Sequence, residues 1–164
     1  MNHMKISMQL NGELRDVEVD PRDILLDVLR EKLGIKSPKI GCEKGDCGAC
    51  TILMNGKTVR SCLILAVEAD GQEIVTVEGI GRQGMTPLQK AFVQHNSFQC
   101  GFCAPGMTLS ATELLSRIPH PTHEQIREAL AGNLCRCTGY TPIVDAVYEA
   151  SRKNGKRTTG KRKI

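Results

Sequence analysis

Residues 41–50 read Gly41-Cys42-Glu43-Lys44-Gly45-Asp46-Cys47-Gly48-Ala49-Cys50, a stretch that places three cysteines within nine residues. Glycines alternate with these cysteines, and glycine lets backbone amide groups approach a bound centre closely. Cys62 follows as a fourth cysteine further along the chain. The spacing therefore predicts a tight loop that gathers four thiol groups around one centre.

A second set of four cysteines lies in two later segments. These segments read Gln99-Cys100-Gly101-Phe102-Cys103-Ala104-Pro105-Gly106 and Gly132-Asn133-Leu134-Cys135-Arg136-Cys137-Thr138-Gly139-Tyr140. The two sets account for all eight cysteines of the chain. Because four thiolates suffice to hold one metal centre, two complete sets predict two centres.

The first spacing, C-x4-C-x2-C followed by a distant cysteine, is the plant-type ferredoxin pattern for a [2Fe–2S] cluster. Disulfides are disfavoured, because no apolar signal segment opens the chain and cysteine is a small share of its residues. Structural zinc is the stronger alternative, since Cys100 and Cys103 have the spacing of a zinc knuckle. Cys135-Arg136-Cys137 is tighter than the usual zinc pair. The residues favour iron–sulfur clusters and leave zinc as an open alternative.

Length and charge limit the remaining possibilities. The 164 residues are enough for one domain or two small ones, and no apolar run approaches the roughly 18 residues that cross a membrane. The net charge of +4 is concentrated in residues 151–164, which hold seven basic residues and no acidic one. Such a tail could contact nucleic acid, but a solvated terminus is the favoured interpretation, and we expect disorder in residues 154–164. Reduced thiols without an export signal indicate the cytoplasm.

The first half of the chain has the pattern of a sheet with one helix. We expect strands at 5–10, 14–19, 51–54, 57–62 and 74–77, with two-residue turns at Asn11-Gly12 and Asn55-Gly56. Leucines spaced on one face predict a helix from about Pro21 or Asp23 to Leu33, which Gly34 ends. Strands around one helix, with a metal loop between, indicate a β-grasp ferredoxin arrangement.

The second half is predicted to be helical. Thr86-Pro87 and Thr122 each precede a glutamine at the third helical position, which is typical of a capping box. Helices are also expected from Pro105-Gly106 and from Thr141-Pro142. Four helices of about 8–14 residues would form a compact bundle. The second cysteine set would lie at helix N-termini, where partial positive charge suits a negative cluster.

Together, the three cysteine segments quoted above resemble the iron–sulfur subunit of the molybdenum hydroxylases. That family includes xanthine dehydrogenase, aldehyde oxidoreductases, nicotinate and quinoline dehydrogenases, and aerobic carbon monoxide dehydrogenase. The resemblance runs from about residue 5 to residue 150, and it departs at Ala104, where many relatives have threonine. It implies an α+β fold: a β-grasp domain in residues 1–80, a helical domain in residues 81–153 and the basic tail beyond.

The resemblance also implies two [2Fe–2S] clusters and their ligands. The first cluster would be held by Cys42, Cys47, Cys50 and Cys62. The second would be held by Cys100, Cys103, Cys135 and Cys137. Gln99 would correspond to the glutamine that binds the pterin of a molybdopterin cofactor on a large partner subunit. Electrons would pass from that cofactor through both clusters to FAD on a medium subunit.

No catalytic residue is expected on this chain. Its four histidines are scattered, and we interpret them as non-ligands: His3, His95, His120 and His123. The substrate pocket would belong to the partner, with a purine or another N-heterocycle favoured over an aldehyde or carbon monoxide. A docking face is expected around residues 98–107 and 135–140. No nucleic acid and no membrane span are expected; a freestanding two-cluster ferredoxin and a zinc-bearing nucleic-acid module are the alternatives.

Overall fold

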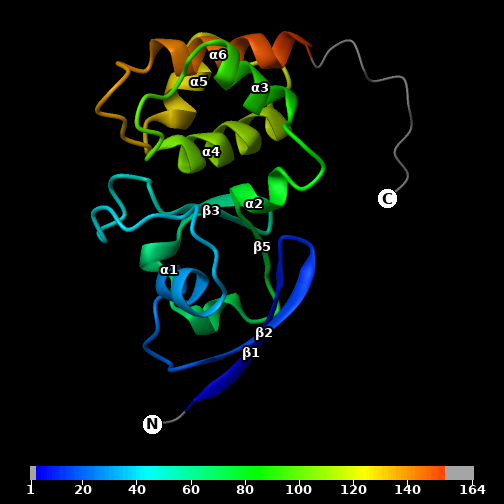
Figure 1. Cartoon of the computed structure of the whole chain (residues 1–164), viewed down its shortest axis with the longest axis vertical. Helices are drawn as coiled ribbons and strands as arrows, with labels where there is room; N and C mark the ends of the chain where they lie inside the picture. Colours follow the sequence, from blue (N-terminus) through cyan, green and yellow to red (C-terminus); the bar gives the residue numbers. More distant parts are fainter. Residues whose placement is uncertain (1–2, 154–164) are drawn as a thin grey trace.

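The computed structural model describes residues 3–153 and separates the chain into two layers (Figure 1). The strands lie at one end of the molecule, and the four longer helices lie together at the other. The strand β3 (Thr51–Met54) and the short helix α2 (Val77–Ile80) lie between the two groups. The basic tail predicted at residues 154–164 lies outside the described residues.

The sheet begins with a hairpin of β1 (Met4–Leu10) and β2 (Glu13–Val19), which are antiparallel. Asn11 and Gly12 turn the chain with φ of +53° and +82°, and the ladder closes with Leu10 opposite Glu13. Both turn residues therefore have the positive φ that a tight hairpin turn requires. The predicted first hairpin is confirmed.

A second hairpin pairs β3 (Thr51–Met54) with β4 (Lys57–Arg60), and β5 (Glu73–Val75) joins the two hairpins. The strand β5 runs parallel to β1 and antiparallel to β3. The resulting five-stranded sheet has the order β2-β1-β5-β3-β4. The last of these five strands, β5, therefore lies between β1 and β3 and joins the two hairpins into one sheet. Local sequence patterns do not reveal this placement.

One helical segment packs on this sheet and buries its leucines. It consists of α1 (Leu25–Asp27) and a π-helical continuation, η1 (Val28–Lys32). The buried side chains of this segment form a core with those of the sheet, including Ile6, Met8, Val19, Leu25, Leu29, Ile52 and Ile74. The helix begins at Leu25, which is later than the expected start at Pro21 or Asp23.

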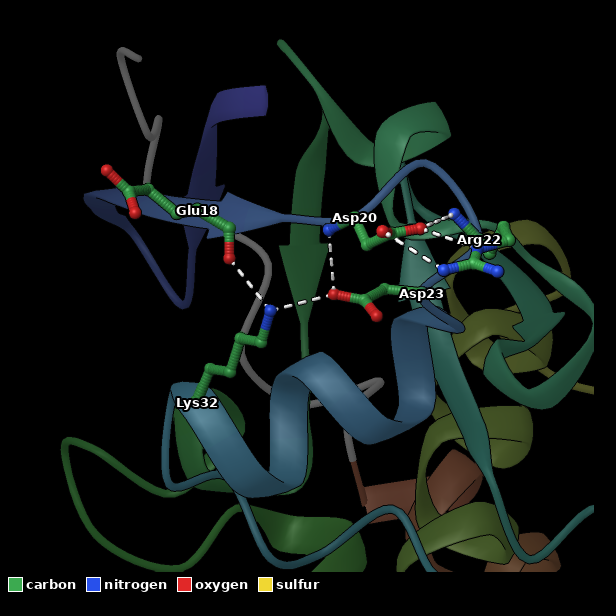
Figure 2. Close-up of polar contacts among 5 residues, drawn as sticks. All are labelled: Glu18, Asp20, Arg22, Asp23 and Lys32. Carbon is green, nitrogen blue, oxygen red and sulfur yellow. Dashed lines mark hydrogen bonds and ion pairs between the residues drawn. The ribbon is translucent and has the colours of Figure 1, made fainter. Parts of the chain in front are cut away.

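A polar network explains the later start of the helix (Figure 2). Asp23 accepts a 3.0 Å hydrogen bond from the backbone N–H of Asp20 and a 2.7 Å bond from Nζ of Lys32. Lys32 also donates to the carbonyl oxygen of Glu18 at 2.9 Å. Hydrogen bonds from the Arg22 side chain and backbone lower the pKa of Asp20 to about 2. These contacts hold residues 20–23 in a turn that links β2 to the helix.

Two predicted strands end earlier than expected. The strand β4 ends at Arg60, and residues Ser61–Leu63 form the 3₁₀ turn η2. The strand β5 ends at Val75, and the helix α2 (Val77–Ile80) follows it. A further 3₁₀ turn, η3 (Ala66–Ala69), lies between the two strands. Cys62 thus lies in a turn rather than in a strand.

The helical layer consists of α3 (Pro87–Gln94), α4 (Ala104–Arg117), α5 (His123–Leu130) and α6 (Thr141–Lys153). Both predicted capping boxes form: Thr86 with Gln89 and Thr122 with Gln125. The helices enclose a separate core that includes Leu88, Phe92, Met107, Leu114, Ile126, Ile143 and Val147. The helix α4 packs against β3 of the sheet. Sheet and helices together confirm the α+β class.

Candidate metal centres

The first cysteine loop lies between the helix α1–η1 and the strand β3, and its outer thiols are Cys42 and Cys47. The backbone N–H groups of Cys47 and Lys44 each donate to Sγ of Cys42 at 3.4 Å. These two donors lower the pKa of Cys42 to about 7. The loop is therefore arranged to stabilise negative charge on sulfur, which is the form that binds metal.

The inner thiols of this set are Cys50 and Cys62, which are 3% and 9% exposed. Burial, and then contact with the Cys50 thiol, raises the pKa of Cys62 to about 11. Ser61 holds the two residues together, because its backbone N–H and its hydroxyl both donate to the carbonyl oxygen of Cys50, at 3.3 and 2.8 Å. The four thiols thus form an outer pair and a buried inner pair.

The second set has the same organisation. Cys100 and Cys137 are exposed, and their sulfurs lie 3.6 Å apart. Cys103 is buried at the N-terminus of α4, where desolvation, and then contact with the Cys135 thiol, raises its pKa to about 12. The backbone N–H of Cys135 donates to the Tyr140 hydroxyl at 2.9 Å. This set also forms an exposed pair and an inner pair.

The pairing of the thiols fits a two-iron cluster better than a single ion. Two thiolates on one tetrahedral metal at ~2.3 Å lie about 3.8 Å apart, close to the Cys100–Cys137 spacing of 3.6 Å. A [2Fe–2S] cluster needs two such pairs, one on each iron. In residues 3–153, no group of three or more His, Cys, Asp or Glu side chains is placed to hold one ion. All eight cysteines are free thiols, so each is available as a ligand.

Gly41 shows how closely the first loop folds around its thiols. A Cβ atom at this position would lie 2.8 Å from Sγ of Cys47 and 4.0 Å from Cε1 of Phe102. Any larger residue would therefore displace a candidate ligand. Phe102 lies between Cys100 and Cys103, so a residue from the second cysteine segment packs beside the first loop. Nζ of Lys39 lies 5.7 Å from the centre of the Phe102 ring.

A backbone hydrogen bond joins the two cysteine sets directly. The N–H of Leu134 donates to the carbonyl oxygen of Cys47 at 2.9 Å. Leu134 immediately precedes Cys135. The cysteine spacing predicts two sites but gives no sign of this contact, because it joins residues far apart in the sequence.

Gln99 lies next to the exposed pair of the second set. Its side chain is exposed, and Nε2 donates to the carbonyl oxygen of Cys137 at 3.1 Å. The histidines lie elsewhere: His95 contacts Glu149, His120 contacts the Ser151 carbonyl and His123 lies near Asp145, all three partners being on α6. His3 lines a surface pocket with Asp20, Arg22, Asp23 and Lys32, four of the residues drawn in Figure 2.

Comparison with known proteins supports the same assignment. Residues 8–76 match the 2Fe-2S iron-sulfur cluster binding domain, and residues 76–148 match a second [2Fe-2S] binding domain. The nicotine 6-hydroxylase small subunit of Paenarthrobacter nicotinovorans is 51% identical over 156 residues, which cover 95% of this chain and 94% of that protein. A chain in the crystal structure of quinoline 2-oxidoreductase from Pseudomonas putida 86 is 46% identical with a TM-score of 0.91, covering 96% of this chain and 99% of that one.

The chain belongs to the iron–sulfur small subunits of the molybdenum hydroxylases. Such small subunits also occur within larger chains: aldehyde oxidoreductase of Megalodesulfovibrio gigas is 46% identical over 90% of this chain, which covers 17% of that protein. The predicted family, the oxidoreductase class and the ferredoxin-like first domain are confirmed. Two matched cluster-binding domains support two [2Fe–2S] clusters rather than zinc. Within residues 3–153, no helix has both the length and the apolar character needed to span a membrane.

Proposed function

We propose that this subunit carries electrons between a molybdopterin-binding large subunit and an FAD-binding medium subunit. Each cluster, when bound, can accept and release one electron. The observation that carries the proposal is the paired arrangement of the thiols. The first cluster is assigned to Cys42, Cys47, Cys50 and Cys62, and the second to Cys100, Cys103, Cys135 and Cys137.

The second cluster is the one that we place beside the molybdopterin cofactor. Its outer ligands Cys100 and Cys137 are exposed, so a partner can approach them closely. The exposed side chain of Gln99 donates a hydrogen bond to the Cys137 carbonyl, so it lies beside these two ligands, where it could contact a pterin. Phe102 and Leu134 expose 46% and 56% of their surfaces and supply apolar area for docking. Exposed apolar side chains of this kind mark interaction surfaces.

The first cluster is then the exit toward FAD. The hydrogen bond from Leu134 to Cys47 provides a short connection between the two sets of ligands. Amide N–H groups directed at Cys42 stabilise negative charge there. Cys42 and Cys47 are only partly buried, which leaves the outer side of this loop accessible to a second partner.

We favour an N-heterocycle, such as a purine, as the substrate of the large subunit. The names of the nicotine and quinoline relatives support this choice. The alternatives are an aldehyde, which the name of the aldehyde oxidoreductase relative supports, and carbon monoxide.

We also propose a cytoplasmic location, because the ligands must remain reduced thiolates. A domain boundary near residue 80 is supported by the separate cores of the two layers.

Coexpression with candidate large and medium subunits from the same organism tests this function. The expected result is a complex that contains molybdenum and FAD and buries more than the roughly 1,600 Å² of a standard interface. Substrate added without an external acceptor should reduce both clusters. A native protein that purifies as an 18.0 kDa monomer and is reduced by a soluble reductase alone would favour a freestanding ferredoxin.

A further inference from the structure

Asn133 occupies a buried position where the two cysteine-bearing layers meet. It is 2% exposed and lies two residues before Cys135. Its Nδ2 group donates to the carbonyl oxygen of Gly48 at 3.0 Å and to the Thr51 hydroxyl at 3.2 Å. Its Oδ1 atom accepts from the Ser110 hydroxyl at 2.7 Å. One side chain therefore connects the second cysteine loop to the end of the first loop and to α4.

Arg60 reinforces the same junction from the strand β4. Its NH1 group donates to the Thr51 hydroxyl at 2.7 Å, and its NH2 group donates to the carbonyl oxygen of Gly132 at 2.6 Å. The Thr51 hydroxyl in turn donates to the carbonyl of Gly48 at 2.6 Å. Thr51 is fully buried, so water cannot replace the partners of its hydroxyl, and the three hydrogen bonds at this oxygen hold the junction together.

Gly106 shows that the two layers approach as closely as their backbones allow. It lies inside α4, where a Cβ atom would be 2.5 Å from the carbonyl oxygen of Gly48 and 2.7 Å from Nδ2 of Asn133. Glycine within a helix is less favourable than alanine. The close approach of α4 to the first cysteine loop explains why glycine is nevertheless suited to this position.

We propose that Asn133, with Thr51 and Arg60, is a positioning network that fixes the distance and orientation between the two cluster sites. The network acts directly on the segments that carry the ligands, since Gly48 follows Cys47 and Asn133 precedes Cys135 by two residues. Electron transfer weakens steeply with distance, so a fixed separation keeps it fast. The inference rests on the proposed electron-transfer function but concerns this chain alone.

The network can be tested in the cluster-loaded subunit by electron paramagnetic resonance. With both clusters reduced by dithionite, each signal should be split by the magnetic interaction with the other cluster. Gly106→Ala inserts a methyl group at the junction, and Thr51→Val removes the central hydroxyl while keeping the shape. Both variants should reduce the splitting at least twofold while they retain the iron content of the wild type.

Two matched variants control for effects unrelated to the junction. Thr51→Ser keeps the hydroxyl and should keep the splitting, and Ser116→Ala, on the exposed side of α4, should leave it unchanged. Unchanged splitting in both Gly106→Ala and Thr51→Val would overturn the proposal. Loss of iron from both variants would also overturn it, because the network would then hold ligands rather than set their separation. Failure of the electron-transfer function would be seen separately, as absent reduction by substrate in the wild-type complex.

Discussion

The backbone N–H of Leu134 lies 2.9 Å from the carbonyl oxygen of Cys47 and donates a hydrogen bond to it. Cys47 is a proposed ligand of the first cluster, and Leu134 is bonded to Cys135, a proposed ligand of the second. A single hydrogen bond thus completes a path of backbone atoms between the two sites. In the proposed function, electrons pass from the second cluster to the first across this contact.

The contact can be removed without changing either ligand. Leu134→Pro eliminates the N–H group, so we expect slower electron transfer from the second cluster to the first and a loss of about 1 kcal/mol in stability. Leu134→Ala keeps the N–H and removes the same apolar side chain from the docking surface, so it is the matched control and should transfer electrons between the clusters faster than Leu134→Pro. Stopped-flow absorbance of the complex, mixed with substrate, measures the rate. Equal rates in the two variants would show that electrons do not use this hydrogen bond.

Ligand substitutions test the order of the clusters. Cys137→Ser should disrupt the second cluster and stop turnover, because oxygen is a harder and weaker ligand than thiolate for iron–sulfur centres. Single-turnover reduction of the partner's molybdenum should survive in this variant. Cys47→Ser should also stop turnover but leave the second cluster reducible by substrate.

The reverse pattern would show that the order is wrong. In that case Cys47→Ser would block reduction of the second cluster, and Cys137→Ser would leave the first cluster reducible by substrate. Both variants require a measured iron content, so that loss of one cluster is separated from loss of both.

Gln99 is expected to act on the contact with the molybdenum subunit rather than on stability. Because its side chain is exposed, Gln99→Ala should change the free energy of unfolding by less than about 0.5 kcal/mol. Iron content should be unchanged, and the reduction of the second cluster by substrate should slow. Gln83→Ala, also at an exposed glutamine, is the control. Equal reduction rates in the two variants would remove Gln99 from the proposed interface.

The carboxylate of Glu149 provides a pH-dependent prediction. The Lys153 ammonium, and then the His95 ring nitrogen 2.5 Å away, lowers the pKa of Glu149 below its usual 4.5. A lowered folded-state pKa contributes stability that is present above pH 4.5 and is lost as pH falls through the folded pKa. Glu149→Gln should therefore lower the melting temperature at pH 7, and the difference should shrink below pH 4. A difference that is constant across this range would contradict the ion-pair explanation, and Glu124→Gln serves as an exposed control.

Local signals in the sequence predict much of this fold. The turns at Asn11-Gly12 and Asn55-Gly56 and the capping box of Thr86 with Gln89 depend on neighbouring residues, and all of them form. Local sequence signals do not reveal the start of the helix at Leu25, because it depends on a network that joins β2 to Lys32. Boundaries of this kind are set by contacts between elements.

The candidate site divides in the same way. Cysteine spacing predicts two sets of four, since most of the cysteines fall in short segments with a regular spacing. The pairing within each set, and the junction between the sets, depend on the folded chain: Asn133 and Gly48 are 85 residues apart. Asn133 lies in the same segment as Cys135 and Cys137, but nothing in that segment indicates that Asn133 contacts Gly48.

Iron and acid-labile sulfide in the purified native chain test the central claim most directly. Two [2Fe–2S] clusters predict about four iron atoms and four labile sulfides per chain, with visible absorption and a brown colour. About two of each would mean that only one set of cysteines holds a cluster. Stoichiometric zinc in a colourless protein without labile sulfide would contradict the assignment of either set to iron.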